Sequence, residues 1–167
     1  MFRICIVLAA LAACLTARAE RAVLECIADT WVAGGDRTAH GREHTLILSK
    51  NGAAALLFRV AAVEGWQLKN VVLLLHLSGG TAPERIRVGP LKASWSESSA
   101  TWNTISRAKA RWRRVRTFDE NWIAIDLDPG EALGHGIILS GGEARFHSRE
   151  TVGFAPYLLV EGSAPPR

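Results

Sequence analysis

The segment SRAKARWRRVR, from Ser106 to Arg116, gathers cationic side chains around one indole ring. Alternate side chains of an extended segment share a face at a spacing of about 6–7 Å. Because a guanidinium group binds a carboxylate through two parallel hydrogen bonds, such a row suits a polymer of uronic acids. The row would comprise Arg107, Lys109, Arg111 and Arg113, with Arg114 beyond it and Trp112 on the other face, unless a turn brings the indole round to stack on a sugar.

Other interpretations of this segment stay open. It could be a solvated loop, or an edge strand whose positive charge resists aggregation. A run of arginines also suits nucleic acid, but the N-terminus described below indicates export, and an exported protein rarely meets that ligand. We take the segment as the best candidate for a ligand site.

The segment AGGDRTAHGREHT, from Ala33 to Thr45, predicts a loop with a second basic patch at Arg37 and Arg42. His40 and His44 have an H-x-x-x-H spacing. The glycine between them disfavours the helix that would bring both rings to one metal ion, so we expect no metal site here.

The N-terminus predicts an export signal. One arginine precedes the apolar run ICIVLAALAACL, whose 12 residues are fewer than the roughly 20 that span a membrane. An A-x-A motif ends at residue 19, so residues 1–19 are predicted to be a signal peptide cleaved before Glu20. The alternative is a lipoprotein, because LAAC fits the processing pattern in which Cys14 is lipidated.

The remaining 148 residues suffice for one domain with its own core. Without Arg3 and Arg18, 18 basic residues stand against 16 acidic ones, a formal charge of +2. Electrostatic function therefore depends on local clustering of charge. Cys26 would be the one cysteine left, which excludes an internal disulfide and predicts a small buried side chain.

Short apolar segments separated by Gly, Ser, Asn, Asp and Pro predict strands. In ERIRV, Ile86 and Val88 share one face while Arg85 and Arg87 share the other. The run VVLLLHL, from Val71 to Leu77, is apolar almost throughout, as in a central strand covered on both faces. The predicted strands are Ala22–Val32, Thr45–Leu48, Ala54–Ala61, Asn70–Leu77, Glu84–Val88, Trp122–Leu127, Gly136–Leu139, Ala144–Ser148 and Tyr157–Glu161.

About nine or ten short strands and no sustained helical period favour an all-β fold. We predict an antiparallel β-sandwich of the jelly-roll type. It forms a single domain over residues 20–162, followed by a disordered tail at 163–167.

Several motifs occur in a fixed order along the chain. They are ADTWV at Ala28–Val32, SWSESSATWN at Ser94–Asn103, FHSRE at Phe146–Glu150 and APYLLVEG at Ala155–Gly162. In order and spacing they resemble the DNRLRE domain, also classed as carbohydrate-binding module family 96 and related to disaggregatase-type surface proteins. The resemblance covers about Ala22 to Gly162.

The resemblance implies a secreted or surface-displayed jelly roll, often attached to polysaccharide-degrading enzymes. Some members bind acidic polysaccharides such as alginate through basic side chains on the sandwich. The arginine-rich stretch after Trp102 departs from the family's pattern.

Trp95, Glu97, Thr101 and Trp102 match the central signature of that family. They could form a stacking platform for a ligand or pack into the core. A signature shared by members with unlike ligands favours core packing, with Glu97 or Ser96 accepting an indole N–H.

Three further charged residues belong to these motifs. Arg149 and Glu150 are adjacent on a predicted strand, so we expect them on opposite faces, each paired with a neighbouring strand. Asp29 is a weak candidate ligand for a structural calcium ion. A hydrogen bond to its own backbone is favoured, because the sequence shows no clustered carboxylates.

No motif indicates catalysis: G-x-S-x-G, H-E-x-x-H, a phosphate loop and a Cys/His nucleophile pattern are all absent from the sequence. We therefore predict a secreted, non-catalytic carbohydrate-binding module for an acidic, uronate-type polysaccharide, without a transmembrane segment. The alternative is a structural or adhesive domain of the cell envelope that contacts protein or matrix.

Overall fold

Antiparallel strands make up most of the chain that the structure describes. The computed structural model describes residues 19–105, 109–119 and 121–165. Residues 1–18 of the predicted signal peptide, with Cys14, and Arg107 therefore lie outside the described residues, as do residues 166–167 of the predicted tail, whose first residue, Ser163, belongs to the last strand. The elements are β1 Glu20–Ala33, β2 Thr45–Leu48, β3 Gly52–Phe58, the 3-10 helix η1 Val60–Val63, β4 Gln67–Gly79, β5 Arg85–Pro90, β6 Arg111–Arg114, β7 Arg116–Thr117, β8 Trp122–Leu127, β9 Ile137–Ser140, β10 Ala144–His147 and β11 Tyr157–Ser163.

All nine predicted strands are present, with small shifts at their ends. The structure adds η1 and two short strands, β6 and β7, which are formed within the arginine-rich segment and at its end. The sequence RWRR of β6 shows no apolar alternation, and the strand forms because β5 offers it an edge to pair with.

The strands form two layers that share β1. The first half of β1 pairs with β11, which is followed by β4, β8 and β7; β10 and β2 extend this layer from the end of β4. The second half of β1 pairs with β3, which is followed by β9, β5 and β6. A register shift between Cys26 and Ala28 marks the crossing of β1 between the layers.

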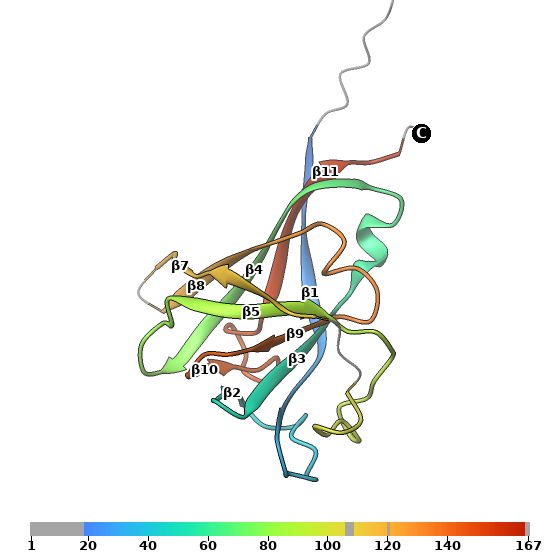
Figure 1. The fold of residues 1–167 in the computed structure, drawn as a ribbon. Coiled ribbons are helices and arrows are strands. Elements are labelled where there is room, and N and C mark those ends of the chain that lie inside the picture. The colour runs from blue at the N-terminus through green and yellow to red at the C-terminus, as the bar shows by residue number, and fades with distance from the viewer. Residues whose placement is uncertain (1–18, 106–108, 120, 166–167) are drawn as a thin grey trace, which may run out of the picture.

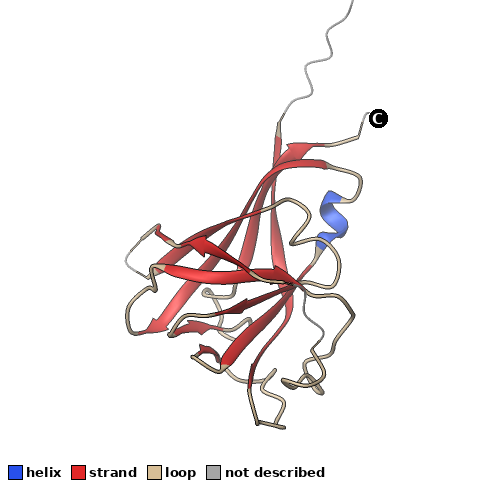
Figure 2. Ribbon diagram, in the orientation of Figure 1, coloured by secondary structure: helices blue, strands red, loops and turns tan. Residues whose placement is uncertain are grey.

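The strand arrangement in Figures 1 and 2 confirms the prediction of an all-β antiparallel jelly-roll sandwich. Long strands run through the body of the sandwich, and most loops gather at its ends.

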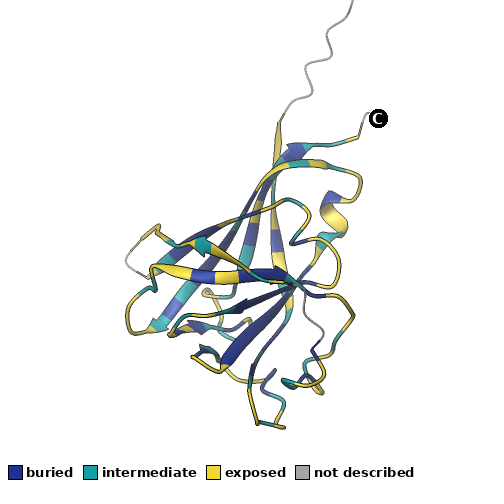
Figure 3. Cartoon of the chain, viewed as in Figure 1, coloured by how far each residue is buried: buried dark blue, intermediate teal, exposed yellow. Residues whose placement is uncertain are grey.

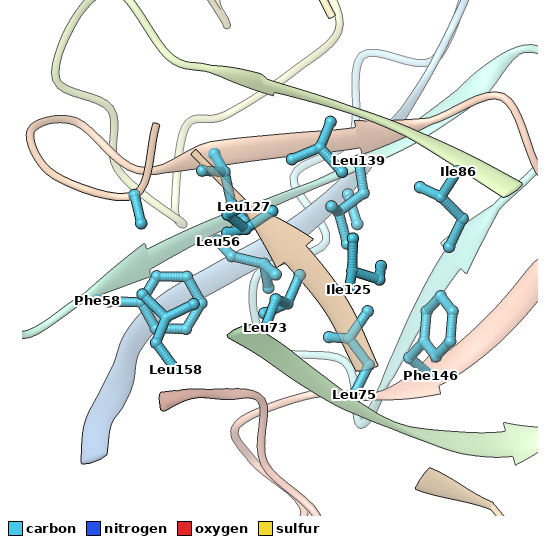
Figure 4. Close-up of a cluster of buried hydrophobic side chains, with 14 of the residues drawn as sticks. Leu56, Phe58, Leu73, Leu75, Ile86, Ile125, Leu127, Leu139, Phe146 and Leu158 are labelled. Atoms are coloured by element: carbon cyan, nitrogen blue, oxygen red, sulfur yellow. The ribbon is translucent and has the colours of Figure 1, made fainter. Parts of the chain in front are cut away.

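The main core lies between the two layers. Figure 4 shows Leu73, Leu75 and Ile125 of the first layer facing Leu56 and Leu139 of the second. Each is fully buried, and burial of such a side chain stabilises the fold by about 1.5–3 kcal/mol. Figure 3 shows the buried positions concentrated in the strands, with the connecting loops exposed.

Strand β4 is central, with β8 on one edge and β11 on the other. Its outer face is covered only in part: Leu74 is buried, whereas Val72 and His76 are half-buried. The predicted coverage on both faces therefore holds for the middle of the strand and fails towards its ends.

A smaller cluster lies on the outer face of the second layer. Val32 of β1, Ala53 and Ala55 of β3 and Ile138 of β9 are covered by the loop between β5 and β6. That loop contributes the apolar side chains Leu91, Ala100 and Ile105, with Trp95 and Trp102 partly buried against them. It leaves the far part of the same face, formed by β5 and β6, uncovered.

Candidate functional site

The uncovered part of the second layer is a ribbon of two strands, β5 and β6. Arg87 lies opposite Trp112 in the register, and Arg85 lies opposite Arg114. Directly opposed residues of antiparallel strands share a face, so these four side chains lie together on the outside. All four are exposed, and Lys109 at the start of the ribbon is exposed as well. We name Arg85, Arg87, Lys109, Trp112 and Arg114 the cationic strip.

The indole of Trp112 lies against the two β5 arginines. The guanidinium carbon of Arg87 is 4.7 Å from the ring centroid, and that of Arg85 is 5.8 Å from it. Both distances are within the range of cation–π attraction. Trp112 nevertheless remains 43% exposed. A shallow hollow beside it is lined by Arg87, Lys109 and Ser140, among others.

A glycine makes room for this stacking. Gly141 follows β9 with φ of +75°, and a Cβ placed there would lie 3.0 Å from the Trp112 ring and 3.3 Å from the Arg87 side chain. Any other residue would be strained by its backbone conformation, and its Cβ would force the indole and the arginine to shift by a few tenths of an ångström.

The opposite face of β6 has a different environment. Arg111 and Arg113 share that face, as the predicted alternation requires, and they face acidic residues. Arg113 Nη2 donates to Asp128 Oδ2 at 2.5 Å and to Glu131 Oε2 at 2.8 Å. The hydrogen bond to Asp128 raises the pKa of Arg113, and the same bond lowers the pKa of Asp128. Arg111 reaches Asp128 at 3.5 Å.

These contacts divide the predicted row of cations. Arg113 holds the turn after β8 against β6, and its charge is already neutralised. Arg111 is 72% exposed and is shared between Asp128 and solvent. Lys109 is free on the surface, and Arg107 lies outside the described residues. Sequence reasoning missed Arg85 and Arg87, although the alternation in ERIRV already placed them on one face.

The predicted second patch lies on the loop between β1 and β2. Arg37 and Arg42 are both exposed there. Figure 1 shows this loop at the end of the sandwich near β2 and β3, while β5 lies across the middle. No described contact joins this loop to the cationic strip.

His40 fixes that loop instead of forming a metal pair with His44. Its Nδ1 lies 2.7 Å from Glu43 Oε1, its Nε2 lies 2.9 Å from Asp36 Oδ2, and its ring stacks on Trp31 at 3.6 Å. Burial disfavours the charged imidazolium, but the hydrogen bonds to both carboxylates outweigh it and raise the pKa of His40. The N–H of Thr38 and then His40 lower the pKa of Asp36 to about 2.

Charged residues from three of the four motifs meet where β1 crosses between the layers. Glu97 accepts two hydrogen bonds from Arg149, Nε to Oε1 at 2.7 Å and Nη2 to Oε2 at 2.9 Å. Glu97 Oε1 also accepts the backbone N–H of Asp29 at 2.7 Å, and Asp29 Oδ2 accepts the N–H of Arg149 at 2.7 Å. Together with Glu150 these residues form the motif cluster.

Two expectations about this cluster are wrong. Arg149 and Glu150 lie beyond the end of β10, so strand alternation does not separate them, and Arg149 Nη2 lies 3.2 Å from Glu150 Oε1. Asp29 accepts from Arg149, 120 residues away, and carboxylates do cluster around it. Desolvation of the buried carboxyl raises the pKa of Asp29 to about 7, against the lowering effect of the Arg149 N–H.

The two tryptophans of the central signature pack as expected against the smaller apolar cluster. The indole partner differs from the expectation: Trp95 Nε1 donates to the carbonyl of His135 at 3.0 Å, and Glu97 binds Arg149 instead. Cys26, expected to be buried, lies half-buried with its thiol 3.4 Å from the carbonyl of Ala28.

A group of aromatic rings on the outer face of the first layer had no sequence signal. Trp122 and His76 face each other in the register of β8 and β4, with ring centroids 5.0 Å apart. Tyr157 lies 5.4 Å from Trp122, and Phe154 and His147 lie 4.2 Å and 5.1 Å from His76. The rings come from separate segments, so only the fold brings them together.

Comparison with known proteins identifies the domain. A sequence model of carbohydrate-binding module family 96 matches residues 20–129, from β1 to the turn after β8. The match includes the cationic strip and two of the four residues of the motif cluster, Asp29 and Glu97. No curated protein matches the chain. Among the described residues, no helix is long and apolar enough to cross a membrane. The chain belongs to carbohydrate-binding module family 96.

Proposed function

We propose that this module binds an acidic, uronate-type polysaccharide through the cationic strip on β5 and β6. The observation that carries the proposal is the pairing state of the arginines. Across the described residues, no carboxylate lies within 4.0 Å of the guanidinium groups of Arg85, Arg87 or Arg114. An exposed arginine without an internal carboxylate is free to bind one on a ligand.

Trp112 gives the strip a second kind of contact. Its half-exposed ring lies among the cations, so a pyranose ring could pack on the indole while its carboxylate reaches a guanidinium group. Aromatic stacking supplies affinity, and the arginine fork supplies preference for acidic over neutral sugars. Arg113 does not enter this ligand set, because Asp128 and Glu131 already occupy its guanidinium group.

Three further predicted ligand residues lie outside the strip, namely Arg111, Arg37 and Arg42. Arg111 lines the hollow beside Trp112 and could turn from Asp128 towards a ligand. Arg37 and Arg42 would need a polymer long enough to reach the end of the sandwich. We propose a secreted, non-catalytic role for the domain, since the predicted signal peptide and the binding-module family both favour it.

Affinity electrophoresis tests this function. The purified chain is run through gels that contain alginate, pectate or a neutral glucan, at low and moderate salt. We expect retardation by an acidic polymer that weakens as salt rises, because exposed charges are screened. The triple variant Arg85→Ser, Arg87→Ser and Arg114→Ser should lose at least tenfold in affinity.

A matched control separates the strip from net charge. Lys50, Lys69 and Arg145 are exposed cations outside the strip. The variant Lys50→Ser, Lys69→Ser and Arg145→Ser removes the same number of charges and should bind almost as the unchanged chain does. Equal losses in both variants would show that binding follows overall charge, and retention by no polymer would refute the proposal.

The alternative function is a structural or adhesive envelope domain. It is favoured by the exposed apolar surface on the outer face of the first layer, where Val23 is 59% exposed and Leu159 is 38% exposed beside the aromatic group. Crosslinking of the chain to a protein partner through this face, without retardation by any polysaccharide, would support this alternative.

A further inference from the structure

Three carboxylates from distant parts of the chain converge in the motif cluster. Asp29 comes from β1, Glu97 from the loop after β5, and Glu150 from the segment after β10. One oxygen of each lies within 4.8 Å of the others. The site offers oxygen ligands only, which is the ligand type that hard divalent cations prefer.

Two of these oxygens are buried without a partner. Asp29 is 1% exposed, and while its Oδ2 accepts from Arg149, its Oδ1 has no hydrogen-bond partner in the described chain. Glu150 Oε2 is likewise buried without a hydrogen-bond partner in the described chain, whereas Glu150 Oε1 forms an ion pair with Arg149. A buried carboxylate oxygen without a donor is costly unless a cation or proton is present.

Arg149 does not supply the missing charge. Its guanidinium fork is committed to Glu97, with both hydrogen bonds at 2.9 Å or shorter. Three carboxylates and one guanidinium group leave a formal charge of −2 when all are ionised. A divalent cation beside Asp29 and Glu150 would balance that charge.

We propose that the motif cluster is a calcium site, with Asp29 Oδ1 and Glu150 Oε2 as ligands and Glu97 beside them. Oxygens bound to Ca²⁺ at 2.3–2.6 Å can lie up to about 5 Å apart, whereas around Mg²⁺ they lie up to about 4 Å apart. One oxygen of each carboxylate lies within 4.8 Å of the others, a separation that a single Ca²⁺ ion can span. Water would complete the coordination shell, as is common for calcium.

The position suggests what the ion does. Asp29 lies just beyond the register shift at which β1 leaves β11 and joins β3. An ion held there would tie β1 to the loop that carries Glu97 and to the segment that follows β10. It would stabilise the end of the sandwich, and it is independent of the sugar site proposed on β5 and β6.

Calcium titration tests the site directly. The chelator-treated chain is titrated with CaCl₂ and then with MgCl₂ in a calorimeter, and thermal unfolding is followed in EDTA and in excess calcium. We expect one saturable calcium site, weaker binding of magnesium, and a midpoint raised by about 4 °C or more in calcium. No polysaccharide is present, so the result is independent of the proposed sugar binding.

Charge-neutral variants distinguish an ion site from a purely structural cluster. Asp29→Asn and Glu150→Gln keep the shape but remove one negative charge each. Both should bind calcium at least tenfold more weakly, yet unfold in EDTA at the same temperature as the unchanged chain or higher, because like-charge repulsion falls. Glu143→Gln, an exposed acid elsewhere, should change neither quantity.

Two results would overturn the proposal. One is that the calorimeter detects no heat of calcium binding and that the unfolding temperature is the same in EDTA and in calcium. This would mean that a proton on the cluster satisfies the buried oxygens. The other is calcium binding that Asp29→Asn and Glu150→Gln leave unchanged, which would place the ion elsewhere.

Discussion

The cationic strip and the motif cluster both concentrate charge, and they differ in whether each charge has a partner. In the strip, Arg85 and Arg87 are exposed and lie against an indole instead of a carboxylate. In the motif cluster, Glu97 and Arg149 bind each other through two hydrogen bonds and also hold the backbone of β1. The pairing of Glu97 with Arg149 indicates a structural role. The groups without a partner, which are the arginines of the strip and the buried oxygens of Asp29 and Glu150, indicate ligand sites.

The largest effect is expected from removing Glu97. The variant Glu97→Ala leaves the Arg149 fork and the Asp29 N–H without their acceptor. We expect a loss of about 3 kcal/mol in the free energy of unfolding, because breaking a partly buried pair leaves an uncompensated charge. Urea denaturation in EDTA measures it.

Glu143→Ala is the control for that loss, since this glutamate is exposed and should cost less than about 0.5 kcal/mol. A small loss for Glu97→Ala as well would mean that the hydrogen bonds of the motif cluster add little, and the contrast with the strip would disappear.

Arg113 and Arg87 lie on opposite faces of the ribbon. We expect the alanine variant of one to lose stability and that of the other to lose affinity. Arg113→Ala removes hydrogen bonds to Asp128 and Glu131, so we expect about 1–2 kcal/mol less stability and an unchanged affinity for acidic polysaccharide. Arg87→Ala should keep stability and lose affinity. Denaturation measures the free energy of unfolding of both variants, and affinity electrophoresis measures their affinity for the polysaccharide.

A loss of affinity in Arg113→Ala, at a salt and temperature where the variant is fully folded, would contradict this division. The ligand would then have to displace Asp128 and Glu131, and the predicted row through Arg111 and Arg113 would be the better description of the site.

Trp112 should matter for binding and little for stability. Trp112→Ala removes the ring on which a sugar would stack, and we expect roughly tenfold weaker binding, about 1.4 kcal/mol. Because the ring is 43% exposed, the free energy of unfolding should change by less than about 0.5 kcal/mol. Tryptophan fluorescence on adding the polymer reports the same contact.

Phe118→Ala serves as the matched aromatic control, since Phe118 is 70% exposed and lies outside the strip. Equal losses of affinity in the two variants would remove Trp112 from the site.

The fold could be predicted because its signals are local. Apolar alternation and glycine or proline breaks located nine strands, and the ordered motifs indicated the family. Strand β6 gave no such signal, since its arginines carry no alternation and its pairing depends on β5. The contact between Arg87 and Trp112 could not be predicted for the same reason, because it depends on the register of β5 and β6.

The motif cluster was beyond sequence reasoning for a different reason. Glu97 is 68 residues from Asp29 and 52 from Arg149, so only the folded topology brings them together. The motifs indicated which residues matter, but the contacts between these residues form only because β1 crosses between the layers. The aromatic group around His76 follows the same rule, with rings drawn from separate segments.

The smallest expected effect lies in the loop between β1 and β2, where a buried histidine pairs with two partly exposed carboxylates. His40 has a raised pKa because Glu43 and Asp36 bind its imidazolium. A raised pKa means that the stabilisation is fully present below the ordinary histidine value of about 6.5 and is lost as the pH rises through the value in the folded chain. The pKa of Asp36 is lowered to about 2, so the contribution of this carboxylate to stability is lost only in strong acid.

We therefore expect the loop to contribute most between about pH 4 and pH 6.5 and to weaken above that range. The difference in unfolding temperature between the unchanged chain and His40→Gln should shrink from pH 6 to pH 9, by about 3 °C or less. Asp29 and His147 also titrate with shifted pKa values, but both are present in the two proteins and cancel in the difference. A difference that stays constant with pH would show that His40 stabilises the loop through its stacking on Trp31 alone, and that paired charge at this exposed end adds nothing.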